Sequence, residues 1–135
     1  MTTQRRDGKG TPFTNWLRLV NKLDSKLGFL TTDLDLVWYC DQGVNSGGKY
    51  YFIEAKNKMA EPKAWQDRLL RKIARNCQND IFFKGFVYLQ FENTSPDDGK
   101  IFWNSVEITA EQLIDFLSFS KEAPSETRFV RKNPK

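Results

Sequence analysis

Apolar and polar side chains alternate along residues 49–58, the stretch where strand character is clearest. Aromatic and β-branched residues run from Tyr50 to Ile53, and such residues are enriched in strands, whose side chains point to alternate faces. The alternation gives two sets, with Tyr50, Phe52, Glu54 and Lys56 on one face and Tyr51, Ile53 and Ala55 on the other. A carboxylate and an ammonium therefore stand side by side where an apolar strand ends, a pattern that on its own is typical of a solvated ion pair.

A second alternating stretch, residues 31–40, precedes this one, with a short strand predicted at residues 29–30 leading into it. It places Asp33 and Asp35 on one face. Because Asp is disfavoured in strands and costly to bury unpaired, these acids need a partner, a cap or a cation. The glycine-rich loop that follows predicts an antiparallel hairpin. Counting back from that loop places Asp35 across from Glu54.

Helical spacing of apolar residues predicts three amphipathic helices. The first begins with Thr14 as its N-cap and ends near Gly28, the second covers residues 63–78, and the third opens at the capping box Thr109–Gln112. In the second helix the arginines gather opposite the apolar stripe, and Gln66 falls near the centre of that stripe. A buried amide needs a hydrogen-bond partner, so Gln66 is either a core hydrogen-bonding residue or a group directed at a site.

Two further strands are predicted over residues 84–91 and 101–106. The polar, basic stretch 1–12 is expected to form a flexible arm, and residues 121–135 lack periodicity and are expected to form a disordered tail. The length of 135 residues then indicates a single domain over residues 13–120.

The composition narrows the chemistry. The chain has no histidine, which excludes Ser-His-Asp and Cys-His mechanisms and zinc sites of the His-containing kinds. Its two cysteines, Cys40 and Cys77, match no metal-ligand spacing, so we expect buried free thiols and a cytoplasmic protein. No apolar stretch is long enough to span a membrane. The net charge of +4 suits a nucleic-acid partner.

The predicted hairpin brings two acids together beside a lysine. If Asp35 lies across from Glu54, and Asp33 lies on the same face, several carboxylate oxygens converge with the ammonium of Lys56 next to them. Such a cluster suits Mg²⁺ or Mn²⁺, which bind carboxylates, backbone carbonyls and water. The lysine could orient a water molecule or neutralise charge on a phosphate.

These residues resemble the motif of the PD-(D/E)XK nuclease superfamily, in which an acid is followed by a second acid, one residue and a lysine. Asp35, Glu54 and Lys56 match it, with 18 residues between the two acids. Resolvase-like and virus-type replication-repair branches also place a Gln or Lys on the next helix, where this chain has Gln66. The residue before Asp35 is Leu34, where the family has proline.

The resemblance implies an α/β, restriction-endonuclease-like core. Its central mixed sheet has about four to five strands flanked by helices, in the order α-β-β-β-α-β, and a C-terminal strand and helix follow it. It implies a Mg- or Mn-dependent endonuclease whose preferred substrate is DNA. Asp35, Glu54 and the Ala55 carbonyl would hold one or two divalent ions, with Asp33 as a further ligand, and Lys56 and Gln66 would complete the catalytic group.

Other interpretations remain open. The fold could serve as a catalytically inactive nucleic-acid-binding module, or Glu54 and Lys56 could form a structural ion pair in a small α/β interaction protein. The substrate could be duplex, branched or single-stranded, and DNA or RNA. One small domain cuts one strand at a time, so a homodimer also stays open.

Overall fold

The computed structural model describes residues 12–28, 30 and 34–124, apart from the side chain of Thr14. The chain divides into two compact units, residues 1–33 and 34–135, and each is described by itself. Three predicted features lie outside the described residues. They are the arm up to residue 11, the acid Asp33, and the tail from residue 125 onward.

The first unit contains α1 and two short 3₁₀ helices, with bounds Pro12–Leu19 for α1, Asn21–Leu23 for η1 and Ser25–Leu27 for η2. The single helix predicted from Thr14 is therefore wrong in its start and in its continuity, although the chain does leave helical structure at Gly28, which has a φ of 94°. Val20 and Asp24 break the helix because both adopt extended backbone angles. Asp24 then caps the last turn by accepting a hydrogen bond from the Lys26 N–H at 2.8 Å.

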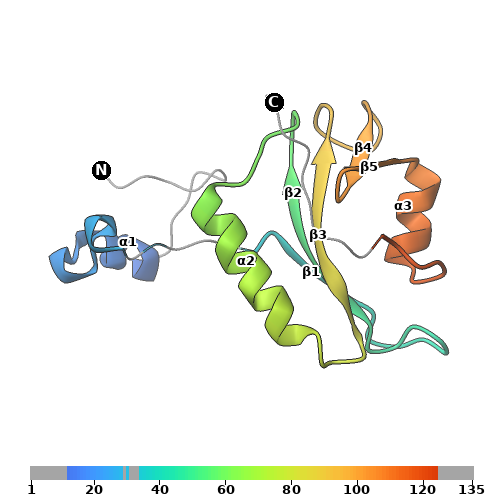
Figure 1. The fold of residues 1–135 in the computed structure, drawn as a ribbon, viewed down its shortest axis with the longest axis horizontal. Helices are drawn as coiled ribbons and strands as arrows, with labels where there is room; N and C mark the ends of the chain where they lie inside the picture. The colour runs from blue at the N-terminus through green and yellow to red at the C-terminus, as the bar shows by residue number, and fades with distance from the viewer. Residues whose placement is uncertain (1–11, 29, 31–33, 125–135) are drawn as a thin grey trace. The chain divides into compact units, whose positions relative to one another are not determined.

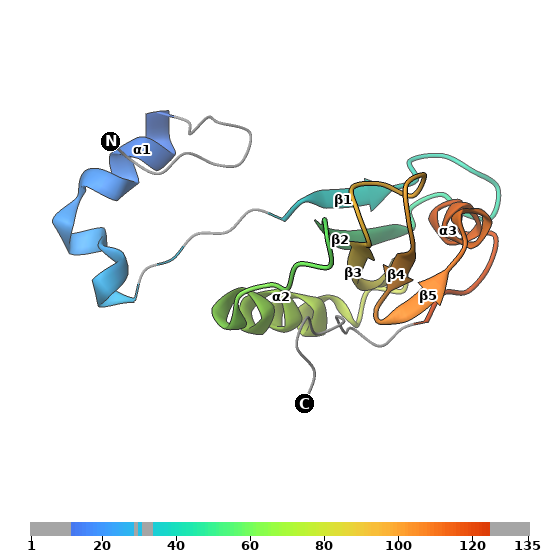
Figure 2. The ribbon, with the colours of Figure 1, turned by 90° about the horizontal axis from the view of Figure 1, so that it is seen from above.

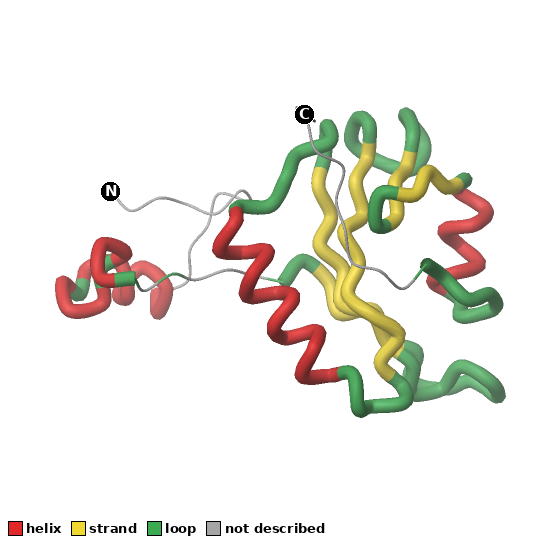
Figure 3. The backbone as a smooth tube through the Cα atoms, in the orientation of Figure 1, coloured by secondary structure: helices red, strands yellow, loops and turns green. Residues whose placement is uncertain are grey.

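The second unit is an α/β structure built on one five-stranded mixed sheet, with strand order β1-β2-β3-β4-β5 (Figures 1 and 3). Among the described strands, β2 and β3 form the one parallel pair. The bounds are Leu36–Tyr39 for β1, Tyr50–Lys56 for β2, Ala64–Cys77 for α2, Phe83–Phe91 for β3, Ile101–Trp103 for β4, Val106–Ile108 for β5 and Ala110–Leu117 for α3.

The two faces of the sheet carry separate cores, one under each helix. On the α3 face, Tyr51 and Ile53 of β2 pack with Trp103 and with apolar residues of α3. On the α2 face, a smaller cluster is built from Leu70 of α2 with aromatic residues of β2 and β3. Figures 1 and 2 show α2 and α3 on opposite sides of the strands. This agrees with the predicted alternation of β2.

The hairpin formed by β1 and β2 is confirmed, with Tyr39 paired to Tyr50 and Leu36 paired to Ile53 in antiparallel register. The first strand is shorter than predicted, since β1 begins only at Leu36. Leu30 is not in a strand, and its predicted partner residue 29 lies outside the described residues. Within the described part of the chain, two strands precede α2, whereas the predicted order has three.

Residues 101–106, predicted as one strand, instead form a tight hairpin of β4 and β5. Trp103 pairs with Val106, and the two residues between them, Asn104 and Ser105, have φ values of 47° and 72°. Two successive positive φ angles are the signature of a type I′ turn, which favours Asn at its first position. The described chain after β3 therefore contains a hairpin and a helix.

Of the remaining predictions about local structure, those for two helices are confirmed and the one for the cysteines is confirmed in part. The capping box at Thr109 is present and opens α3, and α2 has nearly the predicted bounds. Cys40 and Cys77 are free, as expected, but only half-buried. None of the helices in the described ranges is long and apolar enough to cross a membrane.

Candidate functional site

Asp35 and Glu54 meet where β1 begins and β2 nears its end. The Asp35 N–H lies 3.4 Å from Glu54 Oε1, and the Ala55 N–H donates to Asp35 Oδ2 at 2.9 Å. Asp35 is exposed, whereas Glu54 is only 2% exposed. The register counted from the loop therefore brings these two carboxyl groups to the same edge of the hairpin.

The Ala55 carbonyl lies on the same side of β2 as Asp35. A residue in an antiparallel ladder directs its N–H and its C=O toward the same neighbouring strand, and the Ala55 N–H points to Asp35. Since β1 begins only at Leu36, no β1 backbone pairs with Ala55 in the ladder. Three kinds of oxygen therefore gather at this corner, from Asp35, Glu54 and the Ala55 backbone.

Lys56 and Gln66 both contact the second oxygen of Glu54. The Lys56 Nζ lies 3.1 Å from Glu54 Oε2, and the Gln66 Nε2 donates to the same oxygen at 3.3 Å. Lys56 comes from the end of β2 and Gln66 from the first turns of α2. Gln66 is thus directed at this carboxylate, and the cluster joins four of the residues that the sequence singled out.

The electrostatics of Glu54 reflect its burial. Desolvation raises the pKa of Glu54 above its ordinary value, and the neighbouring charge of Asp35 raises it further. The ammonium of Lys56 and the hydrogen bond from the Asp35 backbone act in the opposite direction. A cation placed between Asp35 and Glu54 would relieve the repulsion between these two carboxylates.

The backbone directly after the cluster is strained. Lys58 and Met59 have φ values of 54° and 58°, and left-handed geometry costs a non-glycine residue about 1–2 kcal/mol. The Lys58 N–H donates to the Asn93 carbonyl at 2.8 Å and the Met59 N–H to the Phe91 carbonyl at 2.9 Å. These bonds hold the turn in place immediately beyond Lys56.

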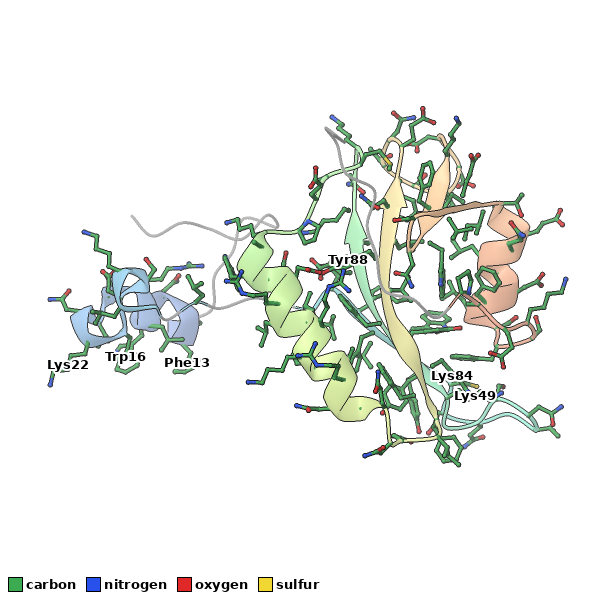
Figure 4. The ribbon with its side chains drawn as sticks, in the orientation of Figure 1. Phe13, Trp16, Lys22, Lys49, Lys84 and Tyr88 are labelled. Carbon is green, nitrogen blue, oxygen red and sulfur yellow. The ribbon has the colours of Figure 1, made fainter. Side chains whose placement is uncertain are left out.

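The sequence did not predict a second polar network, which lies next to the cluster. Tyr88 of β3 is opposite Glu54 in the parallel ladder, and it lies between the sheet and α2 (Figure 4). Its hydroxyl donates to Asp67 Oδ1, and the Arg71 Nε donates to both oxygens of Asp67 at 2.9 Å. Burial is the main cause of a strongly raised pKa of Tyr88. In the sequence, the i, i+4 spacing of Asp67 and Arg71 on the predicted helix could have indicated the ion pair in this network.

This network also explains how α2 sits on the sheet. The predicted apolar stripe is only partly buried, with Leu70 at 3% exposure while Leu69 and Ile73 remain exposed. The side of the helix that faces the sheet includes half-buried Asp67, which accepts the hydrogen bond from Tyr88.

The candidate ligands are oxygen atoms, the kind that a hard divalent cation prefers, but they are few. Two carboxylates and a carbonyl are oxygen ligands of the kind that Mg²⁺ prefers, and Mg²⁺ usually keeps several water molecules. Among the described residues, Glu54 Oε1 has one contact, the long one to the Asp35 N–H, so it is the less engaged oxygen. Within residues 12–28, 30 and 34–124, no group of three or more Cys, Asp or Glu side chains could hold a metal ion. The predicted ligand Asp33 lies outside those ranges.

Comparisons with known proteins identify no relative. No protein-family model matches the chain, and no curated protein and no solved structure is detectably similar to it. Function must therefore be argued from the geometry of the site.

Proposed function

We propose that this protein is a metal-dependent nuclease of the PD-(D/E)XK type that hydrolyses phosphodiester bonds, with DNA as the favoured substrate. The observation that carries the proposal is the convergence of Asp35, Glu54 and Lys56 at one corner of the hairpin, with Gln66 directed at Glu54. Asp35 lies 19 residues before Glu54 in the sequence, and their meeting in the expected register supports the assignment.

The side chains of this chain would divide the chemistry among them. Lys56 keeps 19% of its side chain exposed, so its ammonium can reach a phosphate at the surface and neutralise charge that develops there. Gln66 holds the Glu54 carboxylate in one orientation through its hydrogen bond to Oε2. Exposed Asp35 forms the entrance side of the cluster and is fixed by the Ala55 N–H.

Mg²⁺ or Mn²⁺ would be held by Asp35, Glu54 and the Ala55 carbonyl, with Asp33 as the further ligand that the resemblance implies. When bound, such an ion supplies a Lewis acid that polarises the phosphate and favours ionisation of water. It would also offset the repulsion between Asp35 and Glu54 that contributes to the raised pKa of Glu54.

The test is incubation of the purified full chain with plasmid, single-stranded and four-way-junction DNA, with and without Mg²⁺ or Mn²⁺. We expect cleavage that needs the metal and is lost in Glu54→Gln and Lys56→Met. Lys72→Met, at an exposed lysine on α2, is the matched control and should cut normally. Metal-dependent cleavage that persists in purified Glu54→Gln would sink the assignment, as would the absence of cleavage on every substrate.

A second candidate is a nucleic-acid-binding module with this fold and no catalysis. Two observations favour it: Glu54 is already paired with Lys56 at 3.1 Å, and the described residues hold no group of three acidic or cysteine ligands. The two candidates differ in metal binding. Titration with Mn²⁺ should saturate at millimolar concentration for the nuclease, and Glu54→Gln should abolish that saturation, whereas the module should show no binding.

The partners follow from the same proposal. Cleavage of both strands of a duplex requires two active sites, so a homodimer is the proposed arrangement if plasmid is linearised in one encounter. Light scattering of the protein alone and with duplex DNA distinguishes a dimer from a monomer. RNA in place of DNA in the same assay decides between the two substrates.

A further inference from the structure

Three lysines from separate parts of the chain meet around a small hollow on the α3 side of the sheet. The hollow has a volume of about 120 Å³, and its lining includes Lys49, Lys84 and Lys121 together with Tyr51, Phe119 and Glu122. Lys49 precedes β2, Lys84 lies in β3, and Lys121 follows α3. Figure 4 shows Lys49 and Lys84 side by side where β2 and β3 begin. We call this feature the lysine hollow.

Two of these ammonium groups form no ion pair with any described residue, although Glu122 lies in the same lining. Lys121 lies 3.5 Å from Asp115, but among the described residues Lys49 and Lys84 have no carboxylate within ion-pair distance. Both are half-buried. Lysine is seldom buried without a partner, and two like charges beside one hollow repel each other. An anion between them would remove both costs.

A bulge in the sheet brings Lys84 to the hollow. Tyr50 pairs with Phe83 and Tyr51 pairs with Gly85, which leaves Lys84 as an extra residue in β3. Gly85 makes this possible with a φ of 134°, a geometry that side chains rarely permit. Bulges redirect side chains and are common beside functional sites. Here the irregularity places an unpaired lysine next to Lys49.

The opposite wall of the hollow is held by an unusual residue after α3. Phe119 has a φ of 60°, which costs a bulky side chain energy that glycine would avoid. Its ring stacks on Tyr51 at 5.3 Å between centroids, with an interplanar angle of 11°. This contact fixes the segment that carries Lys121 and Glu122 over the hollow.

We propose that the lysine hollow binds a phosphate group. Lys121 is paired with Asp115, so Lys49 and Lys84 against Glu122 leave an excess of one positive charge in the lining, which suits a singly charged phosphate group. Ligand pockets for whole small molecules usually measure about 300–1,000 Å³, so the hollow admits one phosphate group and leaves the rest of the ligand outside. Burial raises the pKa of Tyr51 to about 12, so its hydroxyl stays protonated and can donate to the anion.

The hollow is separate from the candidate catalytic cluster. Tyr51 and Glu54 point to opposite faces of β2, one packed on α3 and the other toward α2. The inference therefore does not rest on the proposed nuclease activity. The phosphate could belong to a nucleic-acid strand or to a small phosphorylated compound, and the experiment distinguishes these sources.

The test measures binding to the full chain in EDTA, so that cleavage plays no part. The probes are inorganic pyrophosphate and a short single-stranded oligonucleotide that has either a 5′-phosphate or a 5′-hydroxyl end. Calorimetry measures the binding of each probe. The variant is Lys49→Gln with Lys84→Gln, and the control is Lys72→Gln with Lys100→Gln, which removes two exposed lysines and changes the net charge equally. We expect the first pair to weaken binding by at least about tenfold and the control pair to have little effect.

Each result has one meaning. Saturable pyrophosphate binding indicates a small phosphorylated ligand. Tighter binding of the 5′-phosphate oligonucleotide indicates that the ligand is the end of a nucleic-acid strand. Equal binding of both oligonucleotides, without binding of pyrophosphate, indicates that the ligand is an internal backbone phosphate. In case the variant fails to fold, amide NMR shifts of Lys49 and Gly85 in the unaltered protein provide a second measurement. No saturable binding of any probe at millimolar concentration, or equal weakening by both lysine pairs, would overturn the proposal.

Discussion

Replacing Lys56 with methionine should reveal how strongly the buried charge of Glu54 depends on its partner. Methionine keeps the length and apolar stem of lysine and removes only the ammonium. Glu54 is 2% exposed, and Lys56 is the cation paired with it at 3.1 Å. After the substitution, Glu54 would keep only neutral donors, from the Asp35 backbone and Gln66.

The expected loss lies between two limits. Removing one partner of a fully buried pair costs about 3–5 kcal/mol, whereas an exposed pair contributes about 0–1 kcal/mol. Lys56 is 19% exposed, and two neutral hydrogen bonds to Glu54 remain, so we expect a loss of about 2–3 kcal/mol at neutral pH. With a urea dependence of about 1–3 kcal/mol per molar, this loss lowers the unfolding midpoint by roughly 0.7–3 M.

Urea unfolding followed by tryptophan fluorescence measures this directly, because Trp103 is fully buried and will report exposure of the core. Lys72→Met is the control and should stay within about 0.5 kcal/mol of the unaltered protein. Adding Glu54→Gln to Lys56→Met removes the orphaned charge and should recover roughly half of the loss or more. If Lys56→Met unfolds at the unaltered midpoint, or if the double variant is no better, Glu54 does not carry a buried charge that needs Lys56.

Three further predictions concern the pH dependence and two local structures. Burial raises the pKa of Glu54, so the folded state binds the proton of this carboxyl group more tightly than the unfolded state does. The stability of the unaltered protein relative to Glu54→Gln should therefore rise as the pH falls from about 7 toward 5. Urea midpoints of both proteins at the two pH values check the sign. Thr109→Ala removes a capping box and should cost about 1 kcal/mol, with Thr109→Ser close to neutral in the same assay. Asn104→Ala removes the acceptor that lies 2.8 Å from the Tyr88 N–H and strains a turn at positive φ, so it should cost about 2 kcal/mol or more. Asn104→Gly should cost less in thermal melts, because it tolerates the turn.

The parts of the fold that local patterns encode were predictable. Alternation predicts the faces of β2, and a hairpin loop determines which residues lie opposite each other, so the sequence alone predicts Asp35 next to Glu54. The capping box at Thr109 and the bounds of α2 followed from equally local signals. For the same reason the part of the candidate cluster formed by the hairpin could be derived from spacing alone.

The parts that depend on contacts across the chain were not predictable in the same way. The parallel pairing of β2 with β3 decides that Tyr88 lies opposite Glu54, and Tyr88 donates to Asp67 on a side of α2 that the apolar stripe did not predict. The bulge at Lys84 shifts that register in a manner no periodicity shows. The turn at Asn104 did carry a local signal, since Asn favours left-handed geometry, but the apolar run around it concealed the signal.

Asp35 provides the sharpest distinction between a structural ion pair and a catalytic cluster. A pair made only of Glu54 and Lys56 has no use for a second carboxylate, and Asp35 opposes it by raising the pKa of Glu54. Proteins retain such costs where function requires them. Asp35→Asn keeps an oxygen that can accept the Ala55 N–H and removes the repulsion, so it should cause no loss of stability and a gain of up to about 1 kcal/mol in urea unfolding. The same variant should lose metal-dependent cleavage. A stable variant that still cuts would remove Asp35 from the catalytic group, and a clearly destabilised one would show that Asp35 serves the fold.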